Sequence, residues 1–203
     1  MNDPNDSTSI IDDIPFSSSF LEFCAKVRNN ESSILPEFGT CNPFNIRHLS
    51  EKEGIELADA LLENTIVTYL ELETGKYTKS SAEAIAKFVR TSKHLKHINW
   101  NEDWDAVIND RELVLRHREE MFSCFLRAIQ DSTSLKELYM KLPSRGRASN
   151  LALESMLTNT QSLRSLSLMY PDGLLDGRAV AAARSGLQKN TTLRELTLKV
   201  SQG

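Results

Sequence analysis

Five blocks of the chain repeat one pattern: an apolar residue, two others, a second apolar residue, one other and a third apolar residue. The blocks are Val67-Leu70-Leu72, Leu95-Ile98-Trp100, Leu135-Leu138-Met140, Leu163-Leu166-Leu168 and Leu193-Leu196-Leu198. Their first positions lie 28, 40, 28 and 30 residues apart, and the interval of 40 fits a unit of 28 with an insertion of 12. A unit of this length that recurs in register is typical of a solenoid.

The segment before each block repeats as well. Ten, seven and six residues before the first apolar position stand Leu57-Ala60-Leu61, Ile85-Phe88-Val89, Phe125-Ala128-Ile129, Leu153-Met156-Leu157 and Ala183-Gly186-Leu187. Spacings of three, four and seven place these residues on one face of a helix. A small polar residue stands three positions before the first apolar residue of each block. There it can end the helix by hydrogen-bonding to nearby backbone groups. These residues are Asn64, Ser92, Ser132, Thr160 and Asn190.

Each unit is therefore predicted to be a short strand, a loop, a helix and a turn that leads to the next strand. Along the strand, alternation sends Leu70 and Leu72 to one face and Tyr69 and Glu71 to the other. Neither the strand nor the helix can cover its apolar face within one unit, but stacked units bury both. The expected fold is an α/β solenoid of about five repeats, with parallel strands on the concave face and helices on the convex face.

These features resemble those of the leucine-rich repeats, and in particular the ribonuclease-inhibitor type. The resemblance rests on the L-x-x-L-x-L blocks, the 28- and 30-residue intervals and helices such as "LADALLENT", and it covers about residues 50–200. It implies a right-handed α/β horseshoe segment. It also implies that the concave face holds a protein partner.

Three domain features are expected outside the regular units. Residues 1–15 are rich in Asp, Asn and Ser, which predicts a disordered tail. Residues 16–50 contain a helical pattern, "SSSFLEFCAKVRNN", which predicts an N-terminal cap over the array at 51–203. The insertion lies near 101–118, where Trp104 stands among acidic residues. Trp104 can anchor a partner or fold back on the array as part of a lid, and the sequence leaves both readings open.

Composition excludes several classes of partner. The formal net charge of −4 gives no polybasic field, so no nucleic-acid partner is expected. No apolar run approaches the length of a membrane span, so no membrane partner is expected. The three cysteines are scattered and the N-terminus lacks the pattern of a secretory signal. We therefore expect a cytoplasmic protein, with a nuclear location left open.

The sequence shows no catalytic constellation. It has no glycine-rich phosphate loop, no G-x-S-x-G and no H-E-x-x-H motif. We therefore expect no enzymatic activity, no cofactor and no metal site.

The residues that alternate with the core positions form the expected binding face. One row across the strands is Tyr69, His97, Glu137, Ser165 and Glu195, and the next is Glu71, Asn99, Tyr139, Ser167 and Thr197. These ten residues and Trp104 are the predicted partner-binding set. The face has mixed charges and two tyrosines, which suits a protein partner.

A column of cations lies directly after the first apolar position of each block, at Lys96, Lys136, Arg164 and Arg194, with Thr68 in the first repeat. Such a column can steer an acidic partner. Alternatively, the positions are half-exposed and the neighbouring Glu137 and Glu195 neutralise them, which is the interpretation that the sequence favours.

The resulting functional hypothesis is a non-enzymatic module that binds a protein partner on its concave face. This step rests on the resemblance, because a fold alone does not determine function. The alternatives are a GTPase-activator-like regulator or a cytoskeletal scaffold built on the same solenoid. After Leu198 only "KVSQG" follows, so we expect an uncovered last repeat that is frayed, covered by a partner or second copy, or the cut end of a longer protein.

Overall fold

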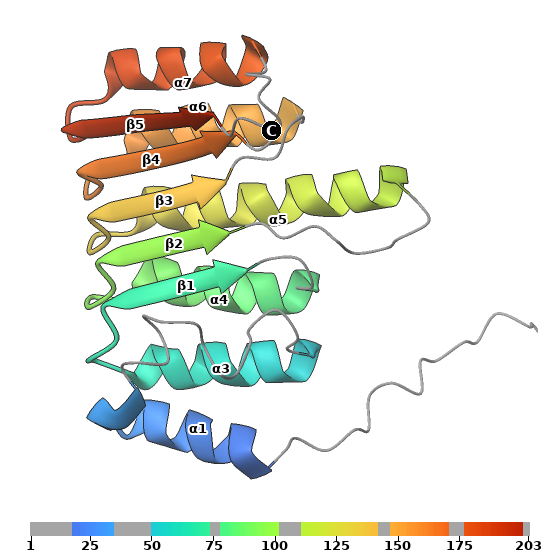
Figure 1. The fold of residues 1–203 in the computed structure, drawn as a ribbon, viewed down its shortest axis with the longest axis vertical. Coiled ribbons are helices and arrows are strands. Elements are labelled where there is room, and N and C mark those ends of the chain that lie inside the picture. Colours follow the sequence, from blue (N-terminus) through green and yellow to red (C-terminus); the bar gives the residue numbers. More distant parts are fainter. Residues whose placement is uncertain are drawn as a thin grey trace, which may run out of the picture.

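A computed structural model describes residues 18–34, 50–73, 78–101, 111–141, 147–170 and 177–200. Helices and strands alternate along the chain and stack in sequence order (Figure 1). The helices are α1 (Ser18–Arg28), η2 (Ser32–Ile34), α3 (Glu51–Glu63), α4 (Lys79–Thr91), α5 (Arg111–Asp131), α6 (Arg147–Asn159) and α7 (Gly177–Lys189). The strands are β1 (Tyr69–Glu73), β2 (His97–Asn101), β3 (Glu137–Lys141), β4 (Ser165–Tyr170) and β5 (Glu195–Val200).

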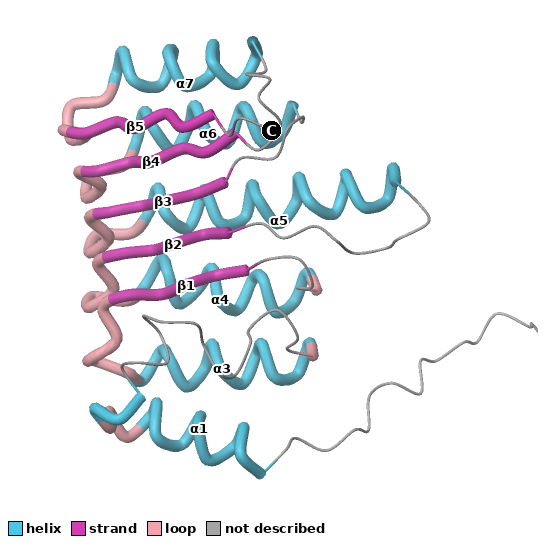
Figure 2. Tube along the Cα trace, viewed as in Figure 1, coloured by secondary structure: helices cyan, strands magenta, loops and turns pink. Residues whose placement is uncertain are grey.

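The five strands form one parallel sheet in the order β1-β2-β3-β4-β5, so every strand pairs with its neighbour in sequence. The helices α3 to α7 lie together on one face of this sheet, and each packs on the next (Figure 2). This arrangement is the predicted α/β leucine-rich-repeat solenoid. We call the face of the sheet that lacks helices the concave face, as in other solenoids of this type.

The predicted core positions of the helices are confirmed. Leu57, Ile85, Phe125 and Leu153 are each at most 3% exposed, and Ala183 occupies the same buried place in α7. On the sheet, Leu70, Ile98, Leu138 and Leu166 are buried under the helices. The apolar residues that recur with a period of 3.6 in the helices and of 2 in the strands therefore pack together in a single layer between helices and sheet.

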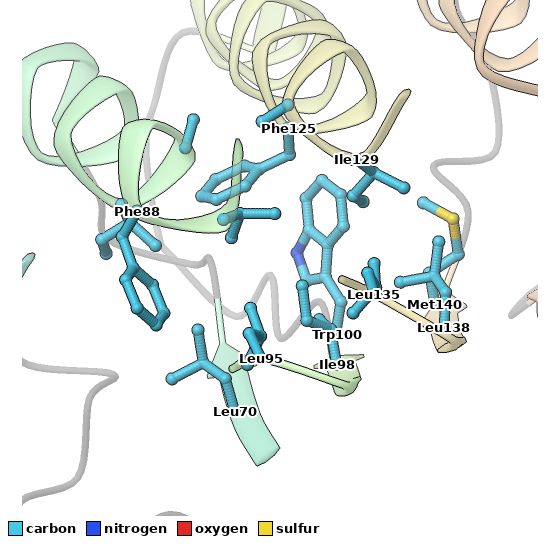
Figure 3. Close-up of a cluster of buried hydrophobic side chains, with 14 of the residues drawn as sticks. Leu70, Phe88, Leu95, Ile98, Trp100, Phe125, Ile129, Leu135, Leu138 and Met140 are labelled. Atoms are coloured by element: carbon cyan, nitrogen blue, oxygen red, sulfur yellow. The ribbon is translucent and has the colours of Figure 1, made fainter. Parts of the chain in front are cut away.

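Trp100 is the largest side chain in this layer. Its ring centroid lies 5.1 Å from that of Phe122 and 4.9 Å from that of Phe125, both on α5. Figure 3 shows the indole pointing away from β2, with Phe125 and Ile129 beside it. The indole thus fills the space between β2 and α5, and its burial contributes to the packing of the middle repeat.

The small polar residue predicted after each helix directly follows the last helical residue in all five repeats. The side-chain oxygen of Asn190 accepts from the backbone N–H groups of Thr192 and Leu193, and Asn64 does the same for Ile66 and Val67. Hydroxyl groups link adjacent turns: Ser134 donates to the Ser92 carbonyl, and Ser162 donates to the Ser132 carbonyl. The turns are therefore joined to one another as well as closed individually.

At the N-terminal end, α1 packs on α3 and buries Phe20, Phe23, Cys24 and Val27. An Arg28 nitrogen lies 2.6 Å from a Glu56 carboxylate oxygen, joining α1 to α3. The predicted tail at 1–15 lies outside the described residues. So does the insertion from 102 to 110, whereas residues 111–118 form the first turns of the long helix α5.

The last repeat differs from the others. Leu196 is 38% exposed and Leu198 is 49% exposed, although their equivalents Leu166 and Leu168 are fully buried on β4. The sequence pattern alone places both leucines in the core, and the structure corrects this. Within the described residues no helix follows β5, and its apolar face is only partly covered.

Candidate functional site

The concave face carries the residues predicted for partner binding in two straight rows. Strand register aligns Tyr69 with His97, His97 with Glu137, Glu137 with Ser165 and Ser165 with Glu195. The second row is aligned in the same way: Glu71, Asn99, Tyr139, Ser167 and Thr197. Because the sheet is parallel and has no register shift, ten positions that are far apart in sequence form one continuous surface.

Seven of these ten residues surround a shallow hollow of about 480 Å³ over β1 to β4. They are Tyr69, His97, Asn99, Glu137, Tyr139, Ser165 and Ser167, with the backbone region of Ile98 and Leu138 beneath them. The small serines on β4 leave room beside the larger tyrosines of β1 and β3. The hollow therefore follows from the alternation of large and small side chains across the strands.

Polar contacts between strands hold several of these side chains in place. Nδ1 of His97 lies 3.1 Å from a carboxylate oxygen of Glu137. The side-chain amide of Asn99 donates to Glu71 across 3.1 Å. These contacts join β1 to β2 and β2 to β3, so this part of the face is partly ordered before any partner binds, which lowers the entropic cost of binding.

The two tyrosines lie on either side of the His97 and Asn99 side chains. Partial burial raises the pKa of the Tyr69 hydroxyl above its ordinary value. The Tyr139 hydroxyl donates to the sulfur of Met169 across 3.3 Å, and the Lys199 ammonium lies 5.8 Å from the centre of the Tyr139 ring. Both rings are half-buried, so each keeps an exposed part that a partner could cover, as aromatic anchors of protein interfaces require.

Two of the ten residues lie outside the hollow on the exposed strand β5, namely Glu195 and Thr197, and Glu71 lies beside it on β1. Trp104, the remaining predicted residue, lies outside the described residues. The structure brings the other members together but does not place Trp104.

Sequence reasoning did not identify a second, larger hollow on the helical side. It measures about 750 Å³ and lies between α4 and α5, with Ala86, Cys124 and Ala128 among its lining residues. Its charged residues have both signs, so they do not define one type of ligand. The small residues that face one another on α4 and α5 are the signal from which it could have been found.

The described part of the chain shows neither a cluster of metal ligands nor a membrane-spanning helix. There, no three His, Cys, Asp or Glu side chains are close enough to share a metal ion. No described helix is both long enough and apolar enough to cross a membrane.

Neither a protein-family model nor a curated protein matches this chain. Among solved structures, one titled "Leiomodin-1 Actin-Binding Site 2 (ABS2)" matches with a TM-score of 0.55 and 17% sequence identity, over 86% of this chain and 92% of that chain. A tropomodulin C-terminal domain from Caenorhabditis elegans matches with a TM-score of 0.56 and 13% identity, over 85% of this chain and 93% of that chain. Identities this low show a shared fold, which is the leucine-rich-repeat solenoid.

Proposed function

We propose that this chain is a non-enzymatic protein-interaction module that binds a protein partner across its concave face. The observation that carries the proposal is the in-register display of ten polar and aromatic side chains on the sheet face that no described helix covers. Two half-buried tyrosines flank the central hollow, and polar residues surround them. This distribution is typical of protein interfaces, in which a few aromatic anchors supply most of the affinity.

The partner that we propose is a cytoskeletal protein, with actin as the first candidate. Support comes from the similar solenoid of leiomodin-1, whose structure is titled as an actin-binding site and of which this chain covers nearly the whole length. We also assign the repeats to the ribonuclease-inhibitor type, on the basis of their 28- and 30-residue intervals and α-helical convex side. A cytoplasmic location accords with such a partner.

The test measures binding of the purified chain to monomeric and filamentous actin, by fluorescence titration and co-sedimentation. Tyr69→Ala and Tyr139→Ala should each weaken binding by about tenfold or more, as expected when a central aromatic anchor is removed. Val180→Ala on α7, a residue 40% exposed on the helical side, is the matched control and should leave affinity unchanged.

Two results would count against the proposal in different ways. Failure of the wild-type chain to bind either form of actin would remove actin as the partner. Unchanged affinity in both tyrosine variants, for actin or for a partner captured with the wild-type chain, would remove the concave face as the binding surface. A change in GTP hydrolysis by small GTPases would instead favour the GTPase-activator alternative.

We further propose that the chain self-associates through β5. This strand is an edge of the described sheet, and its Leu196 and Leu198 side chains are exposed. An edge strand with an apolar face pairs readily with a second chain.

A further inference from the structure

The column of cations at the start of the strands is continuous in the structure. The backbone N–H of Lys136 donates to the Lys96 carbonyl across 2.7 Å. The N–H of Arg164 donates to Lys136, and the N–H of Arg194 donates to Arg164, each across 2.8 Å. The four residues therefore occupy equivalent positions directly before β2, β3, β4 and β5, where neighbouring backbone segments lie about 4.8 Å apart. We call Lys96, Lys136, Arg164 and Arg194 the cationic stripe.

Neutralisation by neighbouring glutamates, which the sequence favours, is not what the structure shows. The Glu137 carboxylate approaches His97 on β2 rather than Lys136 beside it in sequence. Among the residues that the structure describes, no carboxylate forms an ion pair with any member of the stripe. Glu195 lies next to Arg194 in sequence but is exposed on the concave face.

A purely structural role accounts for only half of the stripe. Arg164 donates to the Thr192 carbonyl across 2.9 Å, and Lys96 donates to the Lys93 carbonyl across 3.3 Å. Cations are favourable there because carbonyl groups at helix ends and turns carry partial negative charge. Within the described residues, the side chains of Lys136 and Arg194 make no such contact, so turn stabilisation does not explain why these two positions are also basic.

We propose that the cationic stripe docks the acidic face of an α-helix in a protein partner. This inference rests on the proposed function in one respect, namely that the chain binds a protein. Rows of Arg and Lys are a common means of recognising acidic segments. Arg164 and Lys96 are already held by the turn carbonyls, so ordering them for a partner costs less than ordering free side chains.

The helical form of the ligand follows from spacing. Four positions that each directly precede one of four adjacent strands span about 14 Å, at about 4.8 Å per interval. Acidic residues at i, i+3, i+7 and i+10 of an α-helix span about 15 Å, since each residue rises about 1.5 Å. In an extended segment, alternate residues are about 6.7 Å apart, which is longer than the interval of about 4.8 Å within the stripe. After two positions, the side chains of such a segment no longer lie opposite the cations.

The probe is a synthetic helical peptide with Glu at i, i+3, i+7 and i+10, and its binding is followed by fluorescence anisotropy. A peptide of the same composition with Glu distributed around the helix is the comparison. The ordered peptide should bind at least about fourfold more tightly than the comparison peptide, and added salt should weaken its binding because the charges in contact remain partly exposed to solvent.

Two multiple variants locate the binding. Replacing all four stripe residues with Gln should weaken binding of the ordered peptide about fourfold or more, since each surface ion pair contributes a factor of about 1.4 to 5. Replacing Lys79, Lys87, Arg90 and Arg127 with Gln removes equal charge from the helical side and should change affinity less than twofold. Lys136→Arg with Arg194→Lys keeps the charge of the stripe and should retain binding.

Equal binding of the two peptides, or equal losses in the two Gln variants, would overturn the proposal. So would equally tight binding of a single-stranded RNA oligonucleotide, which would make the stripe a non-selective polyanion surface. Tyr69→Ala and Tyr139→Ala should not change peptide affinity. Failure of the concave-face proposal therefore remains distinguishable from failure of this one.

Discussion

The side-chain amide of Asn64 donates to the carbonyl oxygen of Val27 across 2.6 Å. The side-chain oxygen of the same residue accepts from the backbone N–H groups of Ile66, at 2.9 Å, and Val67, at 2.7 Å. Asn64 is 5% exposed. One buried side chain therefore closes the turn after α3 and joins that turn to α1.

Asn64→Ala is expected to lower the free energy of unfolding by about 2–4 kcal/mol, because it leaves buried backbone groups without hydrogen-bond partners. Chemical denaturation monitored by circular dichroism measures this change. Asn159→Ala is the control, since the Asn159 side chain is exposed, and it should cost less than about 1 kcal/mol. Equal losses in the two variants would contradict the role given to Asn64.

Gly186→Ala is expected to disturb the packing of α7 on α6. A Cβ atom at this position would lie 2.6 Å from the Cβ of Leu157 and 2.9 Å from the Glu154 carbonyl oxygen. Overpacking of this kind costs about 1–3 kcal/mol, even though Ala favours a helix. The melting temperature provides the measurement.

Gly177→Ala in the same helix is the control for Gly186→Ala. A Cβ atom at Gly177 would meet nothing within 4 Å, so this substitution should be neutral or slightly stabilising. A stable Gly186→Ala variant would mean that α6 and α7 do not approach as closely as the structure shows.

The free energy of unfolding should decrease at alkaline pH because of the buried thiol of Cys24. Burial raises the pKa of its thiol from 9.0 to about 12, so the folded state holds the proton after the unfolded state has lost it. The contribution is complete below pH 9.0 and decreases as the pH rises from 9.0 towards about 12. Denaturation curves across this range should show a steeper loss for the wild-type chain than for Cys24→Ala.

Alkylation provides a second measurement on Cys24. The thiol is fully buried between α1 and α3, so iodoacetamide should modify it only after α1 opens or the chain unfolds. Peptide mass spectrometry resolves this site from the other cysteines. Rapid modification of Cys24 in the native chain would show that α1 does not cover α3 in solution.

Leu198→Lys should reduce self-association of the chain. The substitution places a charge on the exposed apolar face of β5, and charged side chains at sheet edges oppose strand pairing. Sedimentation velocity over a range of concentrations measures the effect. Leu151→Lys on α6, where Leu151 is 59% exposed, is the control and should sediment like the wild-type chain. A wild-type chain that remains monomeric throughout would exclude association through β5.

The sequence alone determines the fold and the composition of the concave face. Burial of Leu70, Ile98 and Leu138 and alignment of Tyr69 with His97 follow from periods of 3.6, 2 and 28 residues. These periods are visible because each unit buries its strand and helix against the next unit with nearly the same residues. Even the ends of the helices are predictable, since residues such as Asn64 and Ser92 bind local backbone groups.

Only the tertiary structure decides how neighbouring units differ from one another. The carboxylate of Glu137 approaches His97 rather than Lys136, and no sequence period specifies that choice. The cationic stripe is thereby left without a carboxylate partner among the residues that the structure describes. The exposure of Leu198 likewise depends on whether another element covers it, although its pattern is the same as that of the buried Leu168. The physical reason is that periodicity fixes the face on which a side chain lies, whereas its pairing and burial depend on the particular residues across the next interface.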